Sequence, residues 1–179
     1  YKRQVFIFLI HFHQPVGQLR HVMERVQRNC YEMLARMLGG LEGIRIALHF
    51  SGPLLMAWRD SYPEFLDVVR ELAKRREVEI LGGTFSEAAL PILPEEDRLE
   101  QLVRVRRLVE EMLGVRPKGA WLPERVWDPS LPRPLRRAGY EYVVLDDEVG
   151  FRAGLGEAGV HRAWLTEYSG SKVGVLFID

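Results

Sequence analysis

Residues 5–15 read VFIFLIHFHQP, an apolar run from Val5 to Ile10 that is followed at once by two histidines. The run has the length and composition of a buried strand, and it is far too short to span a membrane. His11 and His13 stand two positions apart, so both side chains point to the same side where the strand ends. We expect this strand to deliver two imidazoles to one site.

Further apolar runs alternate with segments of helical periodicity along the whole chain. This order is typical of β–α units around a parallel sheet, so the fold class is predicted to be α/β. The expected strands are Val5–Ile10, Ile44–Phe50, Val78–Gly83, Gly119–Leu122, Tyr142–Asp146 and Val173–Ile178. Because six strands cannot close an eight-stranded barrel, we expect the edge of the sixth strand to be covered by sequence beyond this chain.

Three intervening helices carry local signals. Residues 95–113 place apolar side chains on one stripe, which predicts a helix on the barrel wall. Ser61, with Pro63 and Glu64 after it, predicts a capped helix start. Pro132 and Pro134 predict a late or irregular start for the following helix.

Composition limits the class of protein. The chain has 179 residues, 47% hydrophobic and 28% charged, which fits one domain over residues 1–179. Its 25 basic residues balance 25 acidic ones, so we expect no nucleic-acid partner. Cys30 is the single cysteine, which excludes an intrachain disulfide and fits a cytoplasmic protein. No membrane partner is expected, and both ends suggest the N-terminal part of a longer enzyme.

Polar residues stand where each expected strand ends. They are His11 and His13, His49, Glu87, Glu124, and the pair Asp146 and Asp147. In parallel β/α barrels the loops at the carboxyl ends of the strands build the active site, so these positions should converge.

Glu124 lies in the segment WLPERVW, residues 121–127, between two tryptophans and next to Arg125. A guanidinium helps to keep a nearby carboxylate ionised, and the indoles of Trp121 and Trp127 can stack on sugar rings. These are the surroundings that the nucleophile of a glycosidase needs. The alternative interpretation is an ion pair in a loop beside tryptophans of the core.

The other acidic candidates are weaker. Glu87 ends the segment GGTFSE, in which paired glycines allow close backbone approach, but a solvated loop carboxylate fits equally well. In Asp146, Asp147 and Glu148, repulsion favours either proton sharing or solvation, and solvation suits Glu148 best.

At these residues the sequence resembles glycoside hydrolase family 57. HFHQP from His11, the segment Gly83 to Glu87, and WLPERVW from Trp121 are similar to three regions of that family, in the same order. The resemblance implies an incomplete seven-stranded parallel (β/α) barrel, of which about six strands are present here. It also implies retaining chemistry on α-1,4-glucan without a metal or cofactor.

Site roles follow from the same resemblance. It implies Glu124 as the nucleophile and a substrate-binding set of His11, His13, Glu87, Trp121, Arg125, Trp127 and Asp147. The region Thr84–Ala88 departs from the family pattern, which affects the expected shape of the sugar site. The family's acid/base, an Asp after the seventh strand, is expected beyond Asp179.

Alternatives remain open from sequence. A metal-dependent barrel hydrolase could use His11 and His13, and a non-catalytic fragment could bind glucan without turning it over. The expected partner is an α-glucan or maltooligosaccharide, with a possible homo-oligomer formed through sequence beyond the chain. Hydrolysis and transglycosylation share one covalent intermediate, so residues alone do not separate them.

Overall fold

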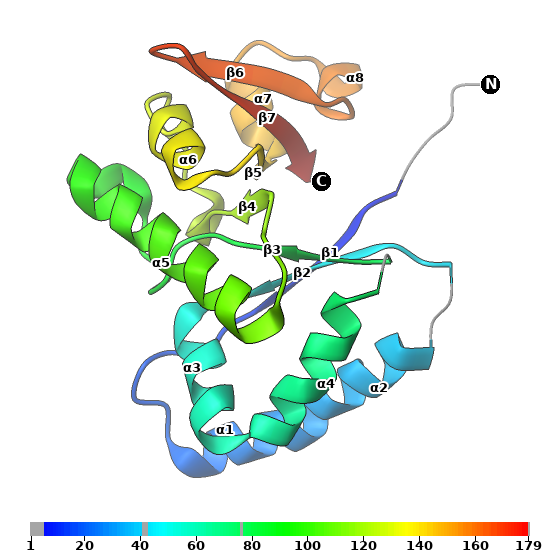
Figure 1. Cartoon of the computed structure of the whole chain (residues 1–179). Coiled ribbons are helices and arrows are strands. Elements are labelled where there is room, and N and C mark those ends of the chain that lie inside the picture. Colours follow the sequence, from blue (N-terminus) through cyan, green and yellow to red (C-terminus); the bar gives the residue numbers. More distant parts are fainter. Residues whose placement is uncertain (1–5, 41–42, 76, 179) are drawn as a thin grey trace.

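The computed structural model describes residues 6–40, 43–75 and 77–178 (Figure 1). The strands are β1 Phe8–Phe12, β2 Ile46–Phe50, β3 Val78–Leu81, β4 Gly119–Trp121, β5 Tyr142–Asp146, β6 Trp164–Tyr168 and β7 Ser171–Ile178. The longer helices are α1 Arg20–Val26, α2 Glu32–Gly40, α3 Gly52–Ser61, α4 Pro63–Ala73, α5 Glu95–Leu113 and α6 Pro132–Ala138. Shorter pieces are the π-helix η1 Gln27–Tyr31, the 3₁₀ turns η2 Leu90–Ile92 and η3 Pro123–Arg125, and the helices α7 Asp147–Arg152 and α8 Glu157–Val160.

The strands form two half-sheets that join at a seam. One half-sheet has the order β1-β2-β3 and the other β4-β5-β7-β6. At the seam, the Gly82 N–H donates to the Gly119 carbonyl at 3.0 Å, and the Trp121 N–H donates to the Gly82 carbonyl at 2.8 Å. Strands β1 to β5 and β7 run parallel, which confirms the α/β class, and helices cover the outer face (Figure 1).

The C-terminal edge differs from the expectation. Strand β6 was not predicted; it pairs antiparallel with β7 and covers the edge that we expected to stay bare within this chain. The two strands are joined through Ser169 and Gly170, with φ of 49° and 77°. Two left-handed residues make the tight turn that suits the twist of a hairpin. The dipeptide Ser-Gly was the available signal in sequence.

Helix and strand ends needed smaller corrections. Helix α4 begins at Pro63 after Tyr62, whereas Ser61 ends α3, so the predicted capping by Ser61 is wrong. Helix α6 begins late, at Pro132, as predicted, because a first turn tolerates prolines that lack an N–H. Strand β1 starts at Phe8 and includes His11; the expected start at Val5 lies outside the described residues.

Three groups of buried side chains hold the layers together. The first core cluster lies between β1–β3 and the outer helices and includes Phe50, Leu54 and Trp58, each at most 2% exposed. The second core cluster, which includes Leu122 and Tyr140, does the same for β4, β5 and β7. Burial of apolar surface on this scale is the main stabilising contribution.

The third group lies on the inner face of the sheet, opposite the face that the first two core clusters cover. Its members come one from each parallel strand, with Tyr142 of β5 beside them: Leu9, Ala47, Leu81, Trp121, Val144 and Ile178. Since side chains alternate between faces along a strand, His11 lies on the same face as Leu9, and His49 on the same face as Ala47. The side chains of the third group therefore lie beside these histidines on the same face of the sheet.

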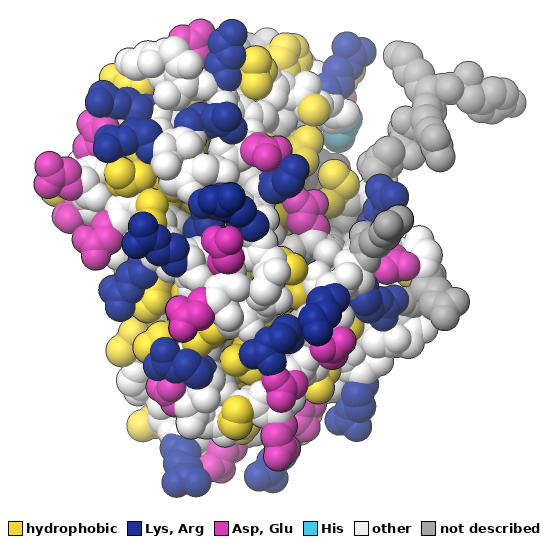
Figure 2. Space-filling view, viewed as in Figure 1, with side chains coloured by type: hydrophobic (Ala, Val, Ile, Leu, Met, Phe, Trp, Pro, Cys, Tyr) yellow, Lys and Arg dark blue, Asp and Glu magenta, His cyan; other side chains and the backbone are white. Residues whose placement is uncertain are grey.

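The surface agrees with the balanced composition. On the face shown in Figure 2, dark blue basic side chains are interleaved with magenta acidic ones and small yellow apolar areas. Among the helices of the described residues, none has both the length and the apolar character needed to cross a membrane.

Candidate active site

The register of β1 and β2 brings two histidines together. His11 and His49 are paired residues of the parallel ladder, and their Nδ1 atoms lie 2.7 Å apart, which is a hydrogen bond. His49 is fully buried, whereas the His11 side chain is 31% exposed. The ring of His13, just after β1, lies nearly parallel to that of His11 with 6.2 Å between centroids. The prediction that His11 and His13 share a side is confirmed.

Burial controls the charge of these rings. It lowers the pKa of His49 well below its ordinary value, with further lowering by His11 and His13. It also lowers the pKa of His11 and of His13. The three imidazoles are therefore neutral at neutral pH, ready to donate or accept hydrogen bonds.

The glycines before Glu87 are required by close contacts. A Cβ at Gly82 would lie 2.1 Å from the Tyr140 hydroxyl oxygen. A Cβ at Gly83 would lie 2.3 Å from the Trp121 carbonyl oxygen and 2.8 Å from His49 Nε2. Backbone therefore passes directly against His49, which a larger residue would prevent.

Glu87 reaches the histidines from the loop after β3. Its Oε2 lies 3.7 Å from His11 Nε2, and its side chain is 13% exposed. Its backbone is left-handed, with φ of 56°. Loss of hydration, together with the nearby charge of Glu124, raises the pKa of the Glu87 carboxyl to about 7.

Glu124 stands on the other side of the seam. It lies in the η3 turn after β4, exposed, with φ of 53°. Its charge acts on both His11 and Glu87, which places it beside that group. The Arg125 Nε lies 3.1 Å from Asp146 Oδ2, so the guanidinium pairs with Asp146.

The two tryptophans have different surroundings. The Trp121 ring stacks on His11, with centroids 5.5 Å apart and planes 22° apart. Trp127 packs against the second core cluster. Asp147, half-buried, is the first residue of α7. The structure thus brings His11, His13, Glu87, Trp121 and Glu124 together. The catalytic role of Glu124 and all the sugar-binding roles, including those of Arg125, Trp127 and Asp147, stay predictions.

Several buried polar atoms of these histidines and of Glu87 lack a hydrogen-bond partner in the described ranges of the chain. His13 Nδ1, His49 Nε2 and Glu87 Oε1 are buried and have no hydrogen-bond partner among the residues that the structure describes. Buried polar atoms of native proteins are normally satisfied. A polyhydroxylated ligand or ordered water suits such atoms.

A metal ion is a second chemical possibility. His11, His49 and Glu87 each offer one ligand atom, and these atoms lie within 4.8 Å of one another. Two imidazoles and a carboxylate suit several divalent transition metals. The grouping differs from the predicted alternative, because His49 takes the place of His13.

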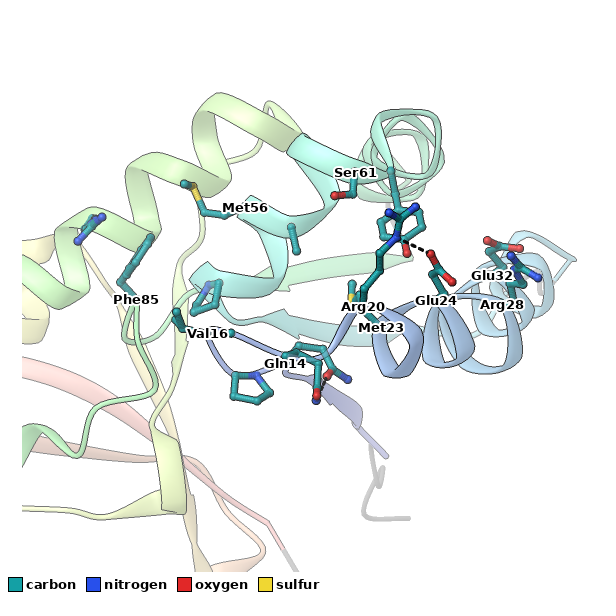
Figure 3. A pocket seen from close by; sticks show the side chains of 17 residues that line it. Gln14, Val16, Arg20, Met23, Glu24, Arg28, Glu32, Met56, Ser61 and Phe85 are labelled. Carbon is teal, nitrogen blue, oxygen red and sulfur yellow. Dashed lines mark hydrogen bonds and ion pairs between the residues drawn. The ribbon is translucent and has the colours of Figure 1, made fainter.

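A cavity of about 950 Å³ opens beside the segment after His13 (Figure 3). Gln14 lines it, and its Nε2 donates to the Tyr31 hydroxyl at 2.9 Å. Phe85 lines one end of the cavity, with the Arg104 guanidinium 3.8 Å from its ring centroid. Arg28 and Glu32 lie at the opposite end (Figure 3). The cavity therefore borders residues next in sequence to His13 and close to Glu87, and its other lining residues come mainly from α1 and α3.

Comparison with known proteins identifies the family. A sequence model described as "Glycosyl hydrolase family 57" matches residues 7–179. The chain belongs to this family. It is 38% identical to an α-amylase of Pyrococcus furiosus and 40% identical to a 4-α-glucanotransferase of Thermococcus kodakarensis, over 97% of its length in both cases. It spans about a quarter of their length, 27% and 26% respectively.

Solved structures of this family agree with the fold. The crystal structure of a 4-α-glucanotransferase from Thermococcus litoralis superposes with a TM-score of 0.93 at 39% identity, covering 99% of this chain and 28% of that one. A putative polysaccharide deacetylase from Mycobacterium smegmatis shares the fold alone, with a TM-score of 0.66 at 16% identity. The predicted family-57 resemblance and partial β/α barrel are confirmed.

One member of the group was missed as a site residue. His49 was placed at a strand end by its sequence position, but it was left out of the predicted binding set. The available signal was that His11 and His49 each stand near the end of an apolar run. In a parallel ladder such positions become neighbours.

Proposed function

We propose that this chain forms part of the active site of a retaining glycoside hydrolase or transglycosylase that acts on α-1,4-glucan. The observation that carries the proposal is the grouping of two carboxyls, three imidazoles and one indole at the carboxyl end of a family-57 sheet. Relatives named α-amylase and 4-α-glucanotransferase support the substrate class.

In this proposal Glu124 attacks the anomeric carbon and forms a covalent glycosyl-enzyme. Its exposure suits an attack on a bound polymer, and its fixed turn limits the positions of the carboxylate. His13 and Glu87 bind hydroxyl groups of the sugar through their unpaired polar atoms, His11 contributes its partly exposed ring, and Trp121 covers one face of the sugar. Water or a sugar hydroxyl then attacks the intermediate, giving hydrolysis or transfer.

A retaining reaction also needs a second carboxyl about 5 Å from the nucleophile, which protonates the departing oxygen. We place that acid beyond residue 179, as the family resemblance implies. The cavity lined by Gln14 and Phe85 provides room for further sugar units of the same chain.

Replacement of Glu124 by Gln tests the proposal in the full-length protein that contains these residues. The amide keeps the shape and loses the attacking charge, so turnover of maltoheptaose should fall by about a thousandfold or more. An unchanged circular dichroism spectrum is expected, since the side chain is exposed. Glu148→Gln is the matched control, because it makes the same chemical change at an exposed carboxylate on α7.

Mass spectrometry after reaction with a fluorinated glucosyl fluoride supplies a second measurement. The label should appear on the peptide that contains Glu124 and be absent from the Glu124→Gln protein. Activity of that variant close to the parent rate, or a label on another carboxylate, would contradict the assignment. Glucan binding without turnover by the parent would favour the non-catalytic alternative.

A metal-dependent hydrolase is the second candidate, favoured by the grouping of His11, His49 and Glu87. Elemental analysis of the purified protein distinguishes the two functions. One divalent metal per chain, with activity lost on chelation and restored by that metal, would support metal chemistry. Full activity of metal-free protein would exclude it.

A further inference from the structure

His49 occupies an unusual place in the group. It is fully buried and lies in β2, the middle strand of the first half-sheet. The backbone of Gly83 lies so close to the His49 ring that a Cβ added at Gly83 would be 2.8 Å from His49 Nε2. Its ring is therefore enclosed by protein. The ring that faces the more open side is that of His11, whose side chain is 31% exposed.

The contact between the two rings couples their protonation sites. At 2.7 Å, one Nδ1 must donate a proton and the other must accept it, because two N–H groups or two lone pairs would repel. In a neutral imidazole the ring that donates from Nδ1 has a bare Nε2, and the ring that accepts at Nδ1 carries its proton on Nε2. Fixing the tautomer of His49 thus fixes that of His11.

Two observations favour His49 as the donor in the hydrogen bond between the two rings. His11 Nε2 faces Glu87 Oε2 at 3.7 Å, and once Glu87 is ionised, at a pH above its pKa of about 7, an N–H there is favourable and a lone pair would be repelled. His49 Nε2 has no partner within the described part of the chain. An unsatisfied buried acceptor is more common in proteins than an unsatisfied buried N–H, so a bare Nε2 is the better state for His49.

We propose that His49 is a positioning residue that donates its Nδ1–H to His11 and thereby holds His11 as the tautomer with Nε2–H directed at Glu87 and the sugar. The proposal rests on the proposed function only in that His11 binds substrate. His49 itself touches no sugar. It acts in the way that outer hydrogen-bond partners of metal-bound histidines fix a ring and its tautomer.

Matched substitutions at residue 49 test the hydrogen bond. Asn places its amide nitrogen near the position of the histidine Nδ1, so His49→Asn keeps a donor to His11; His49→Leu has none. In the full-length protein we expect kcat/KM on maltoheptaose to fall by about 10- to 100-fold for Leu. For Asn the loss should stay within about fivefold, since one hydrogen bond of similar strength is retained.

A double substitution separates positioning from packing. If His49 acts through His11, His49→Leu should change kcat/KM by less than about twofold once His11 is Ala, because the two losses are one interaction. The rates are compared with glucosyl fluoride, whose leaving group needs no protonation and keeps slow variants measurable. A penalty for Leu that is the same with and without His11 would overturn the proposal.

A spectroscopic measurement is independent of activity. NMR of the full-length protein with ¹⁵N-labelled histidine should show His11 protonated at Nε2 and bare at Nδ1, and this pattern should be lost in His49→Leu. His11 protonated at Nδ1 in the parent would overturn the proposal, as would a divalent metal bound by His11 and His49. If Glu124→Gln stays active while the His11 tautomer is as expected, the proposed function fails and the positioning stands.

Discussion

The histidines and the carboxylates of the site are held in different ways. His11 and His49 belong to regular strands, and the parallel register of β1 and β2 determines their contact. Glu87 and Glu124 stand in turns after β3 and β4, with left-handed φ of 56° and 53°. Such a backbone costs about 1 kcal/mol or more for a residue with a side chain. The sheet itself therefore fixes the imidazoles. The carboxyl groups are fixed by strained turns, which the surrounding packing must maintain.

Of the substitutions considered, Gly83→Ala should have the largest effect, because it disturbs the packing around the strand residue His49. The new Cβ would lie 2.3 Å from the Trp121 carbonyl oxygen, which is backbone and cannot move aside cheaply. We expect a loss of about 2 to 4 kcal/mol in the free energy of unfolding, measured by chemical denaturation. Activity should fall with it, because the same methyl group displaces His49.

The control for this substitution is Gly39→Ala. Gly39 lies in α2 with no atom within 4 Å of an added Cβ, so alanine should stabilise by up to about 1 kcal/mol through helix propensity. Equal stability of Gly83→Ala and the parent would show that the backbone at Gly83, just after β3, does not approach Trp121 and His49 as closely as described.

Glu87→Gln tests how one of the two loop carboxyls is held, because the variant removes a buried group that can ionise. The folded pKa of Glu87 is raised from 4.5 to about 7, so the folded protein binds more protons than the unfolded one between these values. The stability of the parent should therefore fall as pH rises from 4.5 to 7, by about 2 to 3 kcal/mol relative to the variant.

Denaturation of both proteins across this pH range measures the effect. The neighbouring histidines have lowered pKa values and give the opposite slope, but they are present in both proteins and largely cancel in the difference. Glu148→Gln, exposed on α7, is the control and should give a flat difference. A flat difference for Glu87→Gln as well would mean that its carboxyl is hydrated.

Arg125→Gln should have the smallest effect. The side chains of Arg125 and Asp146 are 44% and 32% exposed, so their ion pair is weakened by water and salt. We expect a loss below about 1 kcal/mol in thermal unfolding, decreasing further at high salt. Arg152→Gln removes a similar surface pair and is the control. A loss well above that of the control would show that the Arg125 pair helps to maintain the Glu124 turn.

The sequence was sufficient to predict the features that arise from regular patterns. Apolar runs with β–α alternation placed every parallel strand, and the helix at residues 95–113 was found within its bounds. The convergence of His11, Glu87 and Glu124 followed from the rule that strand ends share a rim. Each of these signals depends on local periodicity or on topology, which sequence carries directly.

Features that depend on contacts between distant parts of the chain could not be predicted from the sequence. The His11–His49 hydrogen bond joins residues 38 apart, and it requires the register of β1 against β2. Trp127 stands in the same motif as Trp121, yet one packs on the second core cluster and the other on His11. No local pattern distinguishes them. Strand β6 was missed because it is short, largely exposed and antiparallel.

The seam between β3 and β4 is narrow, because backbone hydrogen bonds cross it at Gly82. Glu87 follows β3 and Glu124 follows β4, so the two carboxyls are carried by opposite sides of this joint. His11 and His49 both lie on one side. Small opening motions at Gly82 would change the spacing of the carboxyls and leave the histidine pair intact. Amide hydrogen exchange at Trp121, whose N–H crosses the seam, would therefore report on the geometry of the reacting groups.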